Sequence, residues 1–560
     1  MNRIATLVIL VLVSGCVSKR PVGNEYQPFS ADRIKAHMEY LADDSLKGRQ
    51  PGTDGYDAAA RYVATQFKLA GLQPKGDNGS YFQSVPMYRY EVELDTIDVS
   101  LNINGKSQAM KYGKDVNLLV NPNVESVDLT GELVFVGYGL DLPDLGINSY
   151  RDIDVKDKIV VMSANLPKSI NPLAVNFYKT IRAEQAQARG AKSILYLATK
   201  PRKYGDPEAD KRRKQRPIRA PRARGFKNSE GKFSVTAEKM PTRVSLTFEG
   251  MLGLFKQLGL DAMETYQQIA DEKMPTIDFS GIQLTTSFKG SAKFWRKSDN
   301  VVAFIPGSDP LLKDQFVVMS AHLDHLGERA QSKQDDKIYN GLLDNAAGVS
   351  TMIELAHRYA QLAIKPKRSI MFLAVTEEEV GLRGSEYFAQ NPTIEKNNIV
   401  TNINLDMPVL TYEFDTVTAF GSEHSSLAKS IEESLTKIDM KLLPDPIPEV
   451  NAFFRSDQYR FVQQGIPSTM LLAGFDKADS EGNKGDYHFW EFYKNHYHKP
   501  TDDINLPILC QSAAKFTLAN YVIINELANA DEIPTWNKDS IFSQLFKERS
   551  ELSVNAASAQ

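Results

Sequence analysis

The chain has 560 residues, of which 42% are hydrophobic and 24% are charged. This composition is typical of soluble globular proteins, and the length exceeds what a single hydrophobic core usually supports, so we expect two or three domains. A formal net charge of -4 indicates neither nucleic acid nor an acidic polymer as a partner.

The N-terminus has the pattern of an export signal. Arg3 supplies a positive charge, and residues 4–13 form an apolar stretch that is too short to span a bilayer. The next residues complete the segment LVSGC, which resembles a bacterial lipobox, where the chain is cut before the cysteine and its thiol is lipidated. This resemblance implies a lipoprotein signal peptide over residues 1–15 and an acylated Cys16.

Residues 16–28 would then be a flexible tether between the lipid and the folded protein. The residue after the cysteine, Val17, is not the Asp that the resemblance associates with inner-membrane retention. We therefore expect a lipid anchor in the outer membrane that faces the periplasm. An ordinary signal peptide with a chance cysteine is the alternative, and either version predicts export.

Two amphipathic helices are predicted after the tether. Ile34, Met38 and Leu41 recur at helical spacing behind a cap at Ser30 or Asp32, and a second helix is predicted over residues 56–69. These helices belong to an N-terminal part of a catalytic domain that we place at residues 29–112.

Residues 113–290 have a different character, with short strands separated by turns. The segments VFVGYG and DVKDKIVVM are similar to a protease-associated domain, so we expect a β-rich domain of this kind to be inserted here. Within it, residues 200–227 are rich in Lys and Arg. We expect this basic run to be a solvated surface loop, with binding of an anionic lipid as the alternative.

From residue 291 to residue 530, apolar strands alternate with helices. The strands are predicted at VVAFIPG, QFVVMSAHLDH, RSIMFLAVTEEE and NIVTNINLDM. This alternation predicts an α/β fold with a mostly parallel mixed sheet flanked by helices. Residues 531–560 are expected to form a C-terminal tail.

Polar side chains follow three of these strands, although a core strand has no packing reason to carry them. The strands end at His322 with Asp324, at the run Glu377 to Glu379, and at Asp406. Because ligands bind at the carboxyl ends of strands in α/β sheets, we expect these groups to converge. Each has an ordinary alternative: a strand end that meets solvent, or a solvated face for the three glutamates.

Two loops add to this set. Asp344 stands just before a predicted helix, where an N-cap is the ordinary role of an aspartate, and His498 stands in the segment YHKPTDD. Together the histidines and carboxylates suit two borderline metals with mixed nitrogen and oxygen ligands and no thiolates.

Five motifs in order resemble the two-zinc aminopeptidase family, which includes secreted bacterial leucyl aminopeptidases, glutamate carboxypeptidase and the transferrin receptor. They are HLD at 322–324, DNAAG at 344–348, EEVGLRGS at 378–385, DM at 406–407 and YHKPTD at 497–502. The resemblance implies the zinc exopeptidase fold, similar to phosphorylases and hydrolases, with two Zn²⁺ ions as cofactors.

The same resemblance implies a role for each residue. Asp344 would bridge the two zinc ions, with His322 and Asp406 completing one centre and Glu379 and His498 the other. Glu378 would be the general base. Tyr497 would donate a hydrogen bond to the tetrahedral oxyanion, or would serve only in packing.

The end of the strand that carries His322 predicts a different role for each polar residue there. If strand geometry persists through the segment, His322 and Asp324 point to the same face, and Asp324 would orient the ring of His322 as a second-shell carboxylate. His325 would face away from the metals and have no part in the site.

These observations predict an exported metallo-exopeptidase, and an aminopeptidase is our first hypothesis, with peptides as substrates. The alternatives are a carboxypeptidase of the same family, a glutaminyl cyclase that uses one zinc, and a metal-free receptor-like binding protein. The presence of every ligand position argues against the last of these. The sequence does not reveal which side chain the substrate carries.

Overall fold

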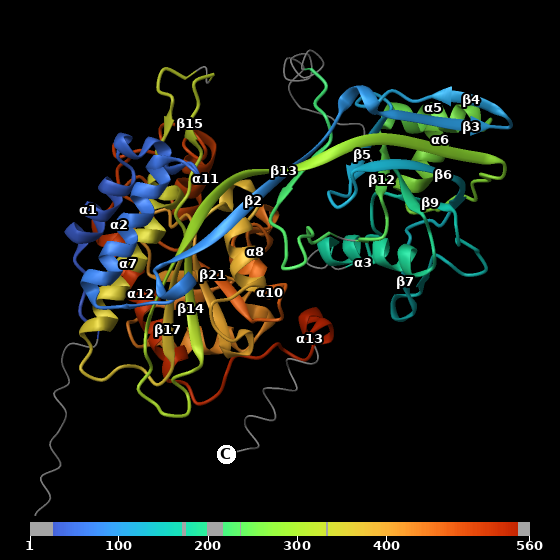
Figure 1. The fold of residues 1–560 in the computed structure, drawn as a ribbon. Helices are drawn as coiled ribbons and strands as arrows, with labels where there is room; N and C mark the ends of the chain where they lie inside the picture. Colours follow the sequence, from blue (N-terminus) through green and yellow to red (C-terminus); the bar gives the residue numbers. More distant parts are fainter. Residues whose placement is uncertain (1–25, 171–174, 199–216, 236, 332–333, 547–560) are drawn as a thin grey trace, which may run out of the picture.

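The computed structural model describes residues 26–170, 175–198, 217–235, 237–331 and 334–546, and it has two lobes joined by a pair of long strands (Figure 1). The predicted signal peptide, Cys16 and most of the tether lie outside the described residues. So do much of the basic run and the last part of the C-terminal tail. Among the described residues, no helix combines the length and apolar character needed to span a bilayer.

Helices α1 (Ala31–Leu41) and α2 (Asp54–Ala70) form where the sequence predicts them. Of the two candidate caps for α1, Ser30 is the one used, because its side chain accepts a hydrogen bond from the backbone N–H of Arg33. Gly71 ends α2 in the left-handed conformation, with φ of 86°. The apolar faces of both helices are buried in the main core.

The central sheet of the larger lobe is mixed, with a parallel centre, which confirms the predicted fold class. Four parallel strands stand side by side in the order β17, β14, β18 and β21, while β13 and β19 are antiparallel neighbours on either side. The bounds are β17 (Ser369–Val375), β14 (Phe316–His322), β18 (Ile399–Leu405), β21 (Ser468–Ala473), β13 (Ile282–Ile305), β19 (Thr416–Phe420), and the short strands β1 (Gln73–Pro74) and β20 (Lys441–Leu443).

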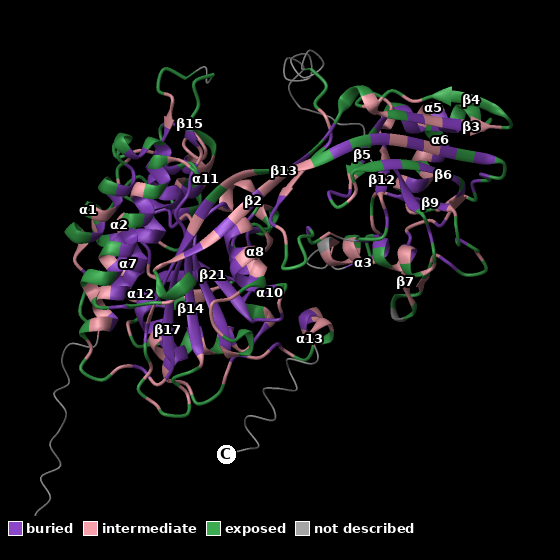
Figure 2. Ribbon diagram, in the orientation of Figure 1, coloured by how far each residue is buried: buried purple, intermediate pink, exposed green. Residues whose placement is uncertain are grey.

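Every residue of the four parallel strands is buried, as Figure 2 shows, because helices cover both faces of the sheet. One face is covered by α1, α2, α7 and α12, which pack against one another, and α8 and α10 lie near the other. The remaining helices have the bounds α7 (Ala347–Gln361), α12 (Cys510–Asn529), α8 (Arg383–Gln390), α10 (Gln458–Val462), α9 (Leu427–Thr436), α11 (Gly485–Asn495) and α13 (Ile541–Leu545).

The smaller lobe has its own sheet and hydrophobic core. Its strands follow the order β4, β3, β13, β6, β9, β10, β12, β5. Their bounds are β3 (Asp98–Ile103), β4 (Lys106–Ala109), β5 (Val116–Val120), β6 (Ser126–Phe135), β9 (Ile159–Ser163), β10 (Ser193–Leu197) and β12 (Thr242–Leu246), with helices α3 (Val175–Ala188), α5 (Phe248–Gln257) and α6 (Ala262–Ala270). Assignment of this lobe as a protease-associated domain stays a prediction.

The boundary between the lobes differs from the predicted one at residue 113. Strand β3 pairs with the part of β13 that lies in the smaller lobe, and β4 pairs with β3, so the chain crosses over earlier, along β2 (Phe82–Val92). The connection between the lobes is a pair of hydrogen-bonded strands. Strands β2 and β13 run antiparallel between the lobes, with a register shift between Phe294 and Arg296. Local strand patterns cannot reveal such a shared strand, because its two ends belong to different cores.

The contact between α1 and α7 predicts a pH-dependent contribution to stability. Glu354 is buried on α7, and its carboxylate accepts hydrogen bonds from Arg33 at 3.1 and 2.7 Å and lies 3.4 Å from Nε2 of His37. Burial raises the pKa of Glu354, but His37 and Arg33 outweigh it and hold the pKa below the ordinary value of 4.5. The stabilisation is therefore present above pH 4.5 and is lost as the pH falls below it.

We expect Glu354→Gln to lower the free energy of unfolding at pH 7 by about 1–3 kcal/mol, as for loss of a hydrogen bond to a charged group. The difference from the wild type should shrink below pH 4.5, measured by urea unfolding at a series of pH values. Glu39→Gln, which removes only an exposed contact with Lys35, is the matched control and should have almost no effect. A deficit that stayed constant down to pH 3 would contradict this account.

Candidate metal centre

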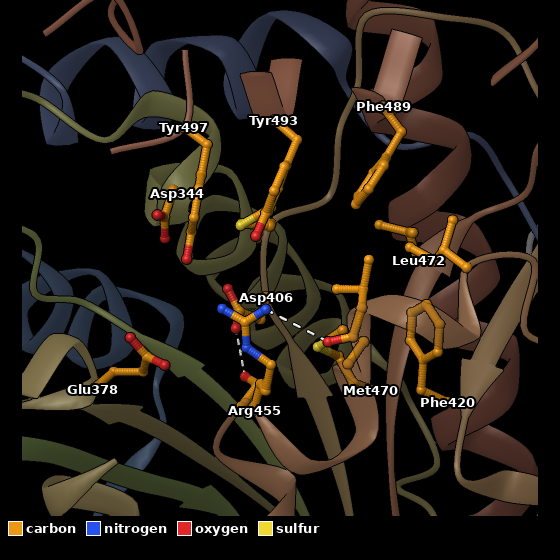
Figure 3. Close-up of a pocket in the computed structure, with 15 residues that line it drawn as sticks. Asp344, Glu378, Asp406, Phe420, Arg455, Met470, Leu472, Phe489, Tyr493 and Tyr497 are labelled. Carbon is orange, nitrogen blue, oxygen red and sulfur yellow. Dashed lines mark hydrogen bonds between the residues drawn. The ribbon is translucent and has the colours of Figure 1, made fainter. Parts of the chain in front are cut away.

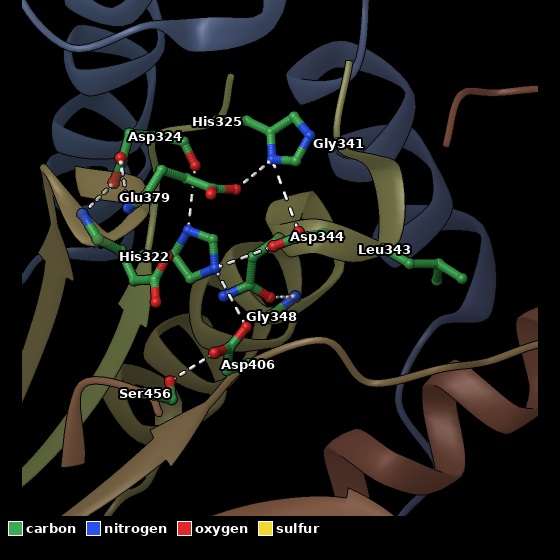
Figure 4. Close-up of polar contacts among 12 residues, drawn as sticks. His322, Asp324, His325, Gly341, Leu343, Asp344, Gly348, Glu379, Asp406 and Ser456 are labelled. Carbon is green, nitrogen blue, oxygen red and sulfur yellow. Dashed lines mark hydrogen bonds and ion pairs between the residues drawn. The ribbon is translucent and has the colours of Figure 1, made fainter. Parts of the chain in front are cut away.

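Histidines and carboxylates converge at the carboxyl edge of the parallel sheet (Figure 4). His322 is the last residue of β14, Asp406 follows β18 directly, and the three glutamates follow β17. These strands are parallel neighbours, so their carboxyl ends meet at one edge. The convergence expected from the sequence is therefore present.

One group consists of His322, Asp344 and Asp406. Nε2 of His322 lies 3.2 Å from Oδ1 of Asp344 and 3.1 Å from Oδ1 of Asp406, and all three side chains are buried. The Oδ2 atom of Asp406 accepts a hydrogen bond from the hydroxyl of Ser456. The group has the donor set of a zinc site with one nitrogen and two carboxylates.

A second group shares Asp344 with the first. Nε2 of His498 lies 3.3 Å from Oδ2 of Asp344 and 3.1 Å from Oε2 of Glu379. Asp344 thus presents one oxygen to each group, as a bridging carboxylate would. His498 has φ of 58°, and its side chain is 36% exposed, so it approaches the group from the open side.

The prediction that His325 faces away is wrong. Its Nδ1 atom lies 2.9 Å from Oε1 of Glu379 and 3.8 Å from Oδ2 of Asp344, and its ring is buried. Strand β14 ends at His322, so the alternation of side chains that placed His325 on the opposite face does not extend to it. His325 is the residue of this site that pattern reasoning excluded.

Asp324 acts through different atoms from those predicted. Nδ1 of His322 donates to the backbone carbonyl oxygen of Asp324, at 3.0 Å, rather than to its carboxylate. The carboxylate instead accepts from the backbone N–H groups of Glu378 and Glu379, at 3.1 and 3.3 Å. Asp324 therefore orients the ring by its main chain and holds the glutamate loop by its side chain.

Asp344 is not an N-cap. Helix α7 begins at Ala347 without a side-chain cap, and Oδ2 of Asp344 has no hydrogen-bond partner within the described part of the chain. Its backbone N–H and that of Leu343 donate to Asp502, the last residue of the YHKPTD motif, at 3.1 and 2.9 Å. Asp502 thus fixes the loop that carries the shared carboxylate.

The three glutamates do not form a solvated face. Glu377 is fully buried, and Arg296 of β13 pairs with both of its oxygens, at 2.6 and 2.5 Å. Glu378 lines a cavity, and Glu379 joins the second group. The chain turns sharply at Glu377, where φ is 59°, so three consecutive side chains leave in three directions.

A buried arginine that no sequence motif singles out supports the site. Arg49, in the loop between α1 and α2, is fully buried and donates to the backbone carbonyls of Leu323, Asn340 and Gly341, and also of Leu41. These carbonyls belong to the two loops that carry His325 and Asp344. Burial lowers the pKa of Arg49 to about 10, although Asp502 and Asp344 oppose the shift.

The electrostatics of the site favour a bound cation. Burial raises the pKa of Asp344 and Glu379, but the adjacent histidines overcome it and hold the pKa of Asp344 far below its usual range and that of Glu379 at about 2. Burial lowers the pKa of His498, and its contacts with the same carboxylates raise it to about 10. The carboxylates are thus held ionised, in the form that ligates a metal.

The donor atoms fit two zinc ions by a further observation. Nδ1 of His322 is committed to a carbonyl, so in the neutral ring Nε2 would offer its lone pair to a metal held by the two carboxylates that it faces. In the second group, Oδ2 of Asp344, Oε1 of Glu379 and both ring nitrogens of His325 are buried without a hydrogen-bond partner. A cation between such atoms would satisfy them, because buried polar atoms without partners are costly.

A cavity opens beside the two groups (Figure 3). Asp344, Glu378 and Asp406 lie at one end, and the rest of the wall is largely apolar. Arg455, from the same segment as Ser456, also lines the cavity. The lining residues are Asp344, Glu378, Asp406, Met407, Phe420, Ile447, Val450, Ala452, Arg455, Ser456, Met470, Leu472, Phe489, Tyr493 and Tyr497.

Tyr497 has features of both roles considered for it. Its ring stacks on His498, with centroids 3.8 Å apart, and on Tyr493, with centroids 4.9 Å apart. Its hydroxyl points into the cavity on the side of Asp344 (Figure 3). Burial and the nearby carboxylates raise the pKa of this phenol far above its usual value, so it stays protonated and able to donate a hydrogen bond.

The position of Asp324 gives a testable prediction. Asp324→Ala removes the acceptor that holds Glu378 and Glu379, and we expect zinc affinity to fall about 10–100-fold, as for loss of other groups that position metal ligands. The measurement is competition with a chelator. Asp309→Ala is the matched control, because Asp309 also accepts two backbone N–H groups but lies away from the site. Equal zinc affinities in both variants would contradict the assignment.

Comparison with known proteins agrees with the motifs. Residues 300–521 match the model of the family described as "Peptidase family M28". A probable leucine aminopeptidase 2 of Aspergillus oryzae is 27% identical over 263 residues, which cover 44% of this chain and 48% of that protein. Leupeptin-inactivating enzyme 1 of Streptomyces exfoliatus is 25% identical over 249 residues, 43% of this chain and 50% of that protein.

The match thus spans about half the length of these two relatives. Among solved structures, an aminopeptidase from Aneurinibacillus sp. strain AM-1 is 16% identical, with 92% of this chain and 97% of that chain covered and a TM-score of 0.44. The matched segment contains every strand that bears a predicted ligand, together with His498. Residues 300–521 of this chain are therefore similar to peptidase family M28.

Proposed function

We propose that this protein is a zinc-dependent metallo-exopeptidase, and specifically an aminopeptidase that removes N-terminal residues from peptides. One observation carries the proposal: two groups of metal-ligating side chains share Asp344 and open onto a cavity that also contains Glu378. Two metals that share a carboxylate are a recurrent device for peptide hydrolysis. The family match over residues 300–521 supports it.

In this proposal Asp344 would hold both zinc ions. His322 and Asp406 would hold the first ion with it, and Glu379 and His498 would hold the second. When bound, the zinc ions would lower the pKa of a water molecule and polarise the scissile carbonyl.

Glu378 is the proposed general base. It lines the cavity, and burial, together with Glu379 and Asp406, raises its pKa well above the usual value, although His322 opposes the shift. A carboxylate with a raised pKa accepts a proton from water more readily and can pass it to the leaving amine. Tyr497 would donate to the oxygen that becomes negative during attack.

The cavity suggests the class of substrate. Beyond the carboxylates its wall is made of Phe420, Ile447, Met470, Leu472 and Phe489, and this surface suits a large apolar side chain next to the scissile bond. The carboxylates at the other end suit the free ammonium group of a peptide N-terminus.

A carboxypeptidase is the second candidate, because Arg455 lines the same cavity. A guanidinium binds a substrate carboxylate with two parallel hydrogen bonds, which an enzyme that recognises a peptide C-terminus needs. Substrates blocked at one end or the other distinguish the two candidates.

The role of Glu378 is tested by Glu378→Gln. We expect this variant to keep about two zinc ions per chain and to lose hydrolysis by about 10²–10⁴-fold, the usual contribution of general acid–base catalysis. Metal analysis and peptide hydrolysis are measured on the same sample. One zinc ion per chain would favour a glutaminyl cyclase, and undiminished hydrolysis would remove Glu378 from the mechanism.

End preference is read from a peptide series. We expect cleavage of peptides that begin with Leu or Phe, and a decrease of about 10-fold or more when the first residue is Ala, because each methylene in an apolar pocket contributes about 1–3 kcal/mol. Acetylation of the N-terminus should abolish cleavage, whereas amidation of the C-terminus should not. The reverse pattern, read by mass spectrometry, would identify a carboxypeptidase.

We also propose that the protein is exported and held on the bacterial outer membrane by a lipid on Cys16. The segment LVSGC is the support for this, and it lies outside the described residues. Cys16→Ser should move the protein from the membrane fraction to the soluble periplasmic fraction. Immunoblotting of the two fractions measures this change. Membrane association that survived this substitution would show that the lipid is not the anchor.

A further inference from the structure

His325 is the side chain at this edge of the sheet that the proposed ligand set leaves unused. Its ring is 1% exposed, and neither ring nitrogen has a hydrogen-bond partner among the described residues. A buried imidazole without partners is costly, and natural structures keep few of them. The ring of His325 is therefore expected to bind a partner that is not a side chain of the described residues.

Its surroundings aim the ring at the second group. Nδ1 of His325 faces Oε1 of Glu379 at 2.9 Å and Oδ2 of Asp344 at 3.8 Å (Figure 4). On the other side, Gly341 closes the space: a Cβ added there would lie 2.5 Å from Cγ of His325. The ring is therefore held between the backbone and the carboxylates.

A hydrogen bond to Glu379 does not explain the arrangement. Although 2.9 Å separates Nδ1 of His325 from Oε1 of Glu379, both atoms remain without a hydrogen-bond partner, as does Oδ2 of Asp344. Three buried atoms that face one another and lack hydrogen bonds are the arrangement expected around a cation. One ligand atom from each of His325, Asp344 and Glu379 lies within 4.8 Å of the other two.

We propose that Nδ1 of His325 is a ligand of the second metal, beside Asp344, Glu379 and His498. This proposal rests on the metal centre proposed above, and it adds an imidazole that the family resemblance does not imply.

The two centres would then be unequal. The first has three protein ligands, His322, Asp344 and Asp406, as in catalytic zinc sites, which keep a position open for water or substrate. The second has four, as in closed structural zinc sites. The second centre should accordingly fill first and retain its metal longer.

Cobalt(II) binding to the metal-free full-length protein tests this order. We expect two binding steps in the wild type, and we expect His325→Gln to weaken the tighter step at least tenfold while it leaves the weaker step unchanged. Equilibrium dialysis gives the stoichiometry, and the visible spectrum of cobalt reports a change of coordination. His357→Gln, which removes a partly buried imidazole from α7, is the matched control.

Affinity alone does not separate a ligand from a residue that positions a ligand, because loss of the latter also costs about 10–100-fold. His325→Cys makes the distinction. A cysteine sulfur is bonded directly to Cβ, one bond closer than Nδ1, and the longer zinc–sulfur bond, about 2.3 Å against 2.0–2.1 Å for zinc–nitrogen, makes up part of the difference in reach. A thiolate in that place should bind cobalt directly and give a sulfur-to-cobalt charge-transfer band.

Absence of that band in a folded His325→Cys protein that still binds cobalt would overturn the proposal, as would an unchanged cobalt spectrum in His325→Gln. If His325→Gln does not fold, the spectrum of the cysteine variant decides. The outcome is independent of peptide hydrolysis: a wild type that binds two cobalt ions but cleaves no peptide refutes the proposed activity and leaves His325 as a ligand. A wild type that binds no cobalt refutes both.

Discussion

The carboxylate of Asp344 is the point on which the site depends. One of its oxygens faces His322 and the other faces His498 and His325. A buried carboxylate in this position is tolerated only if positive charge surrounds it. The neighbouring structure meets this need with histidines in direct contact and with Arg49, whose charge is fully buried close by.

Further carboxyl groups lie buried around Asp344. Asp324, Asp457 and Asp502 are also buried here, and burial raises the pKa of the first to about 8 and of the other two to about 6. Backbone N–H groups and hydroxyls satisfy part of their hydrogen-bonding capacity. Divalent cations bound at this centre would favour the ionised form of these carboxyl groups, because a bound metal changes the protonation of the groups near it.

The joint between the two lobes lies close to the proposed metal centre. Arg296 lies on β13, the strand shared by both sheets. The guanidinium group of Arg296 pairs with the carboxylate of Glu377, the residue before the proposed base. Trp295 lies at the register shift beside it, with Arg224 of the neighbouring β11 (Arg222–Gly225) over its ring. The backbone that presents Glu378 is thus fixed from the joint between the lobes as well as from Asp324.

The sequence by itself determined the elements and most of the site. Continuous apolar runs identified β14, β17 and β18, and the polar residues after them identified His322, Glu379 and Asp406 as neighbours, because the ends of parallel strands must meet. Motif order then added Asp344 and His498. These inferences succeed because they depend on local patterns and on one general property of parallel sheets.

Only the tertiary structure decided the rest. Where β14 ends determines which way His325 points, and that end is set by the loops that Arg49 ties together, not by the strand's own residues. The position of Arg455 in the cavity and the pairing of Glu377 with Arg296 likewise depend on contacts between segments distant in the chain. Side-chain direction beyond a regular element is fixed by packing, so no periodicity in the sequence records it.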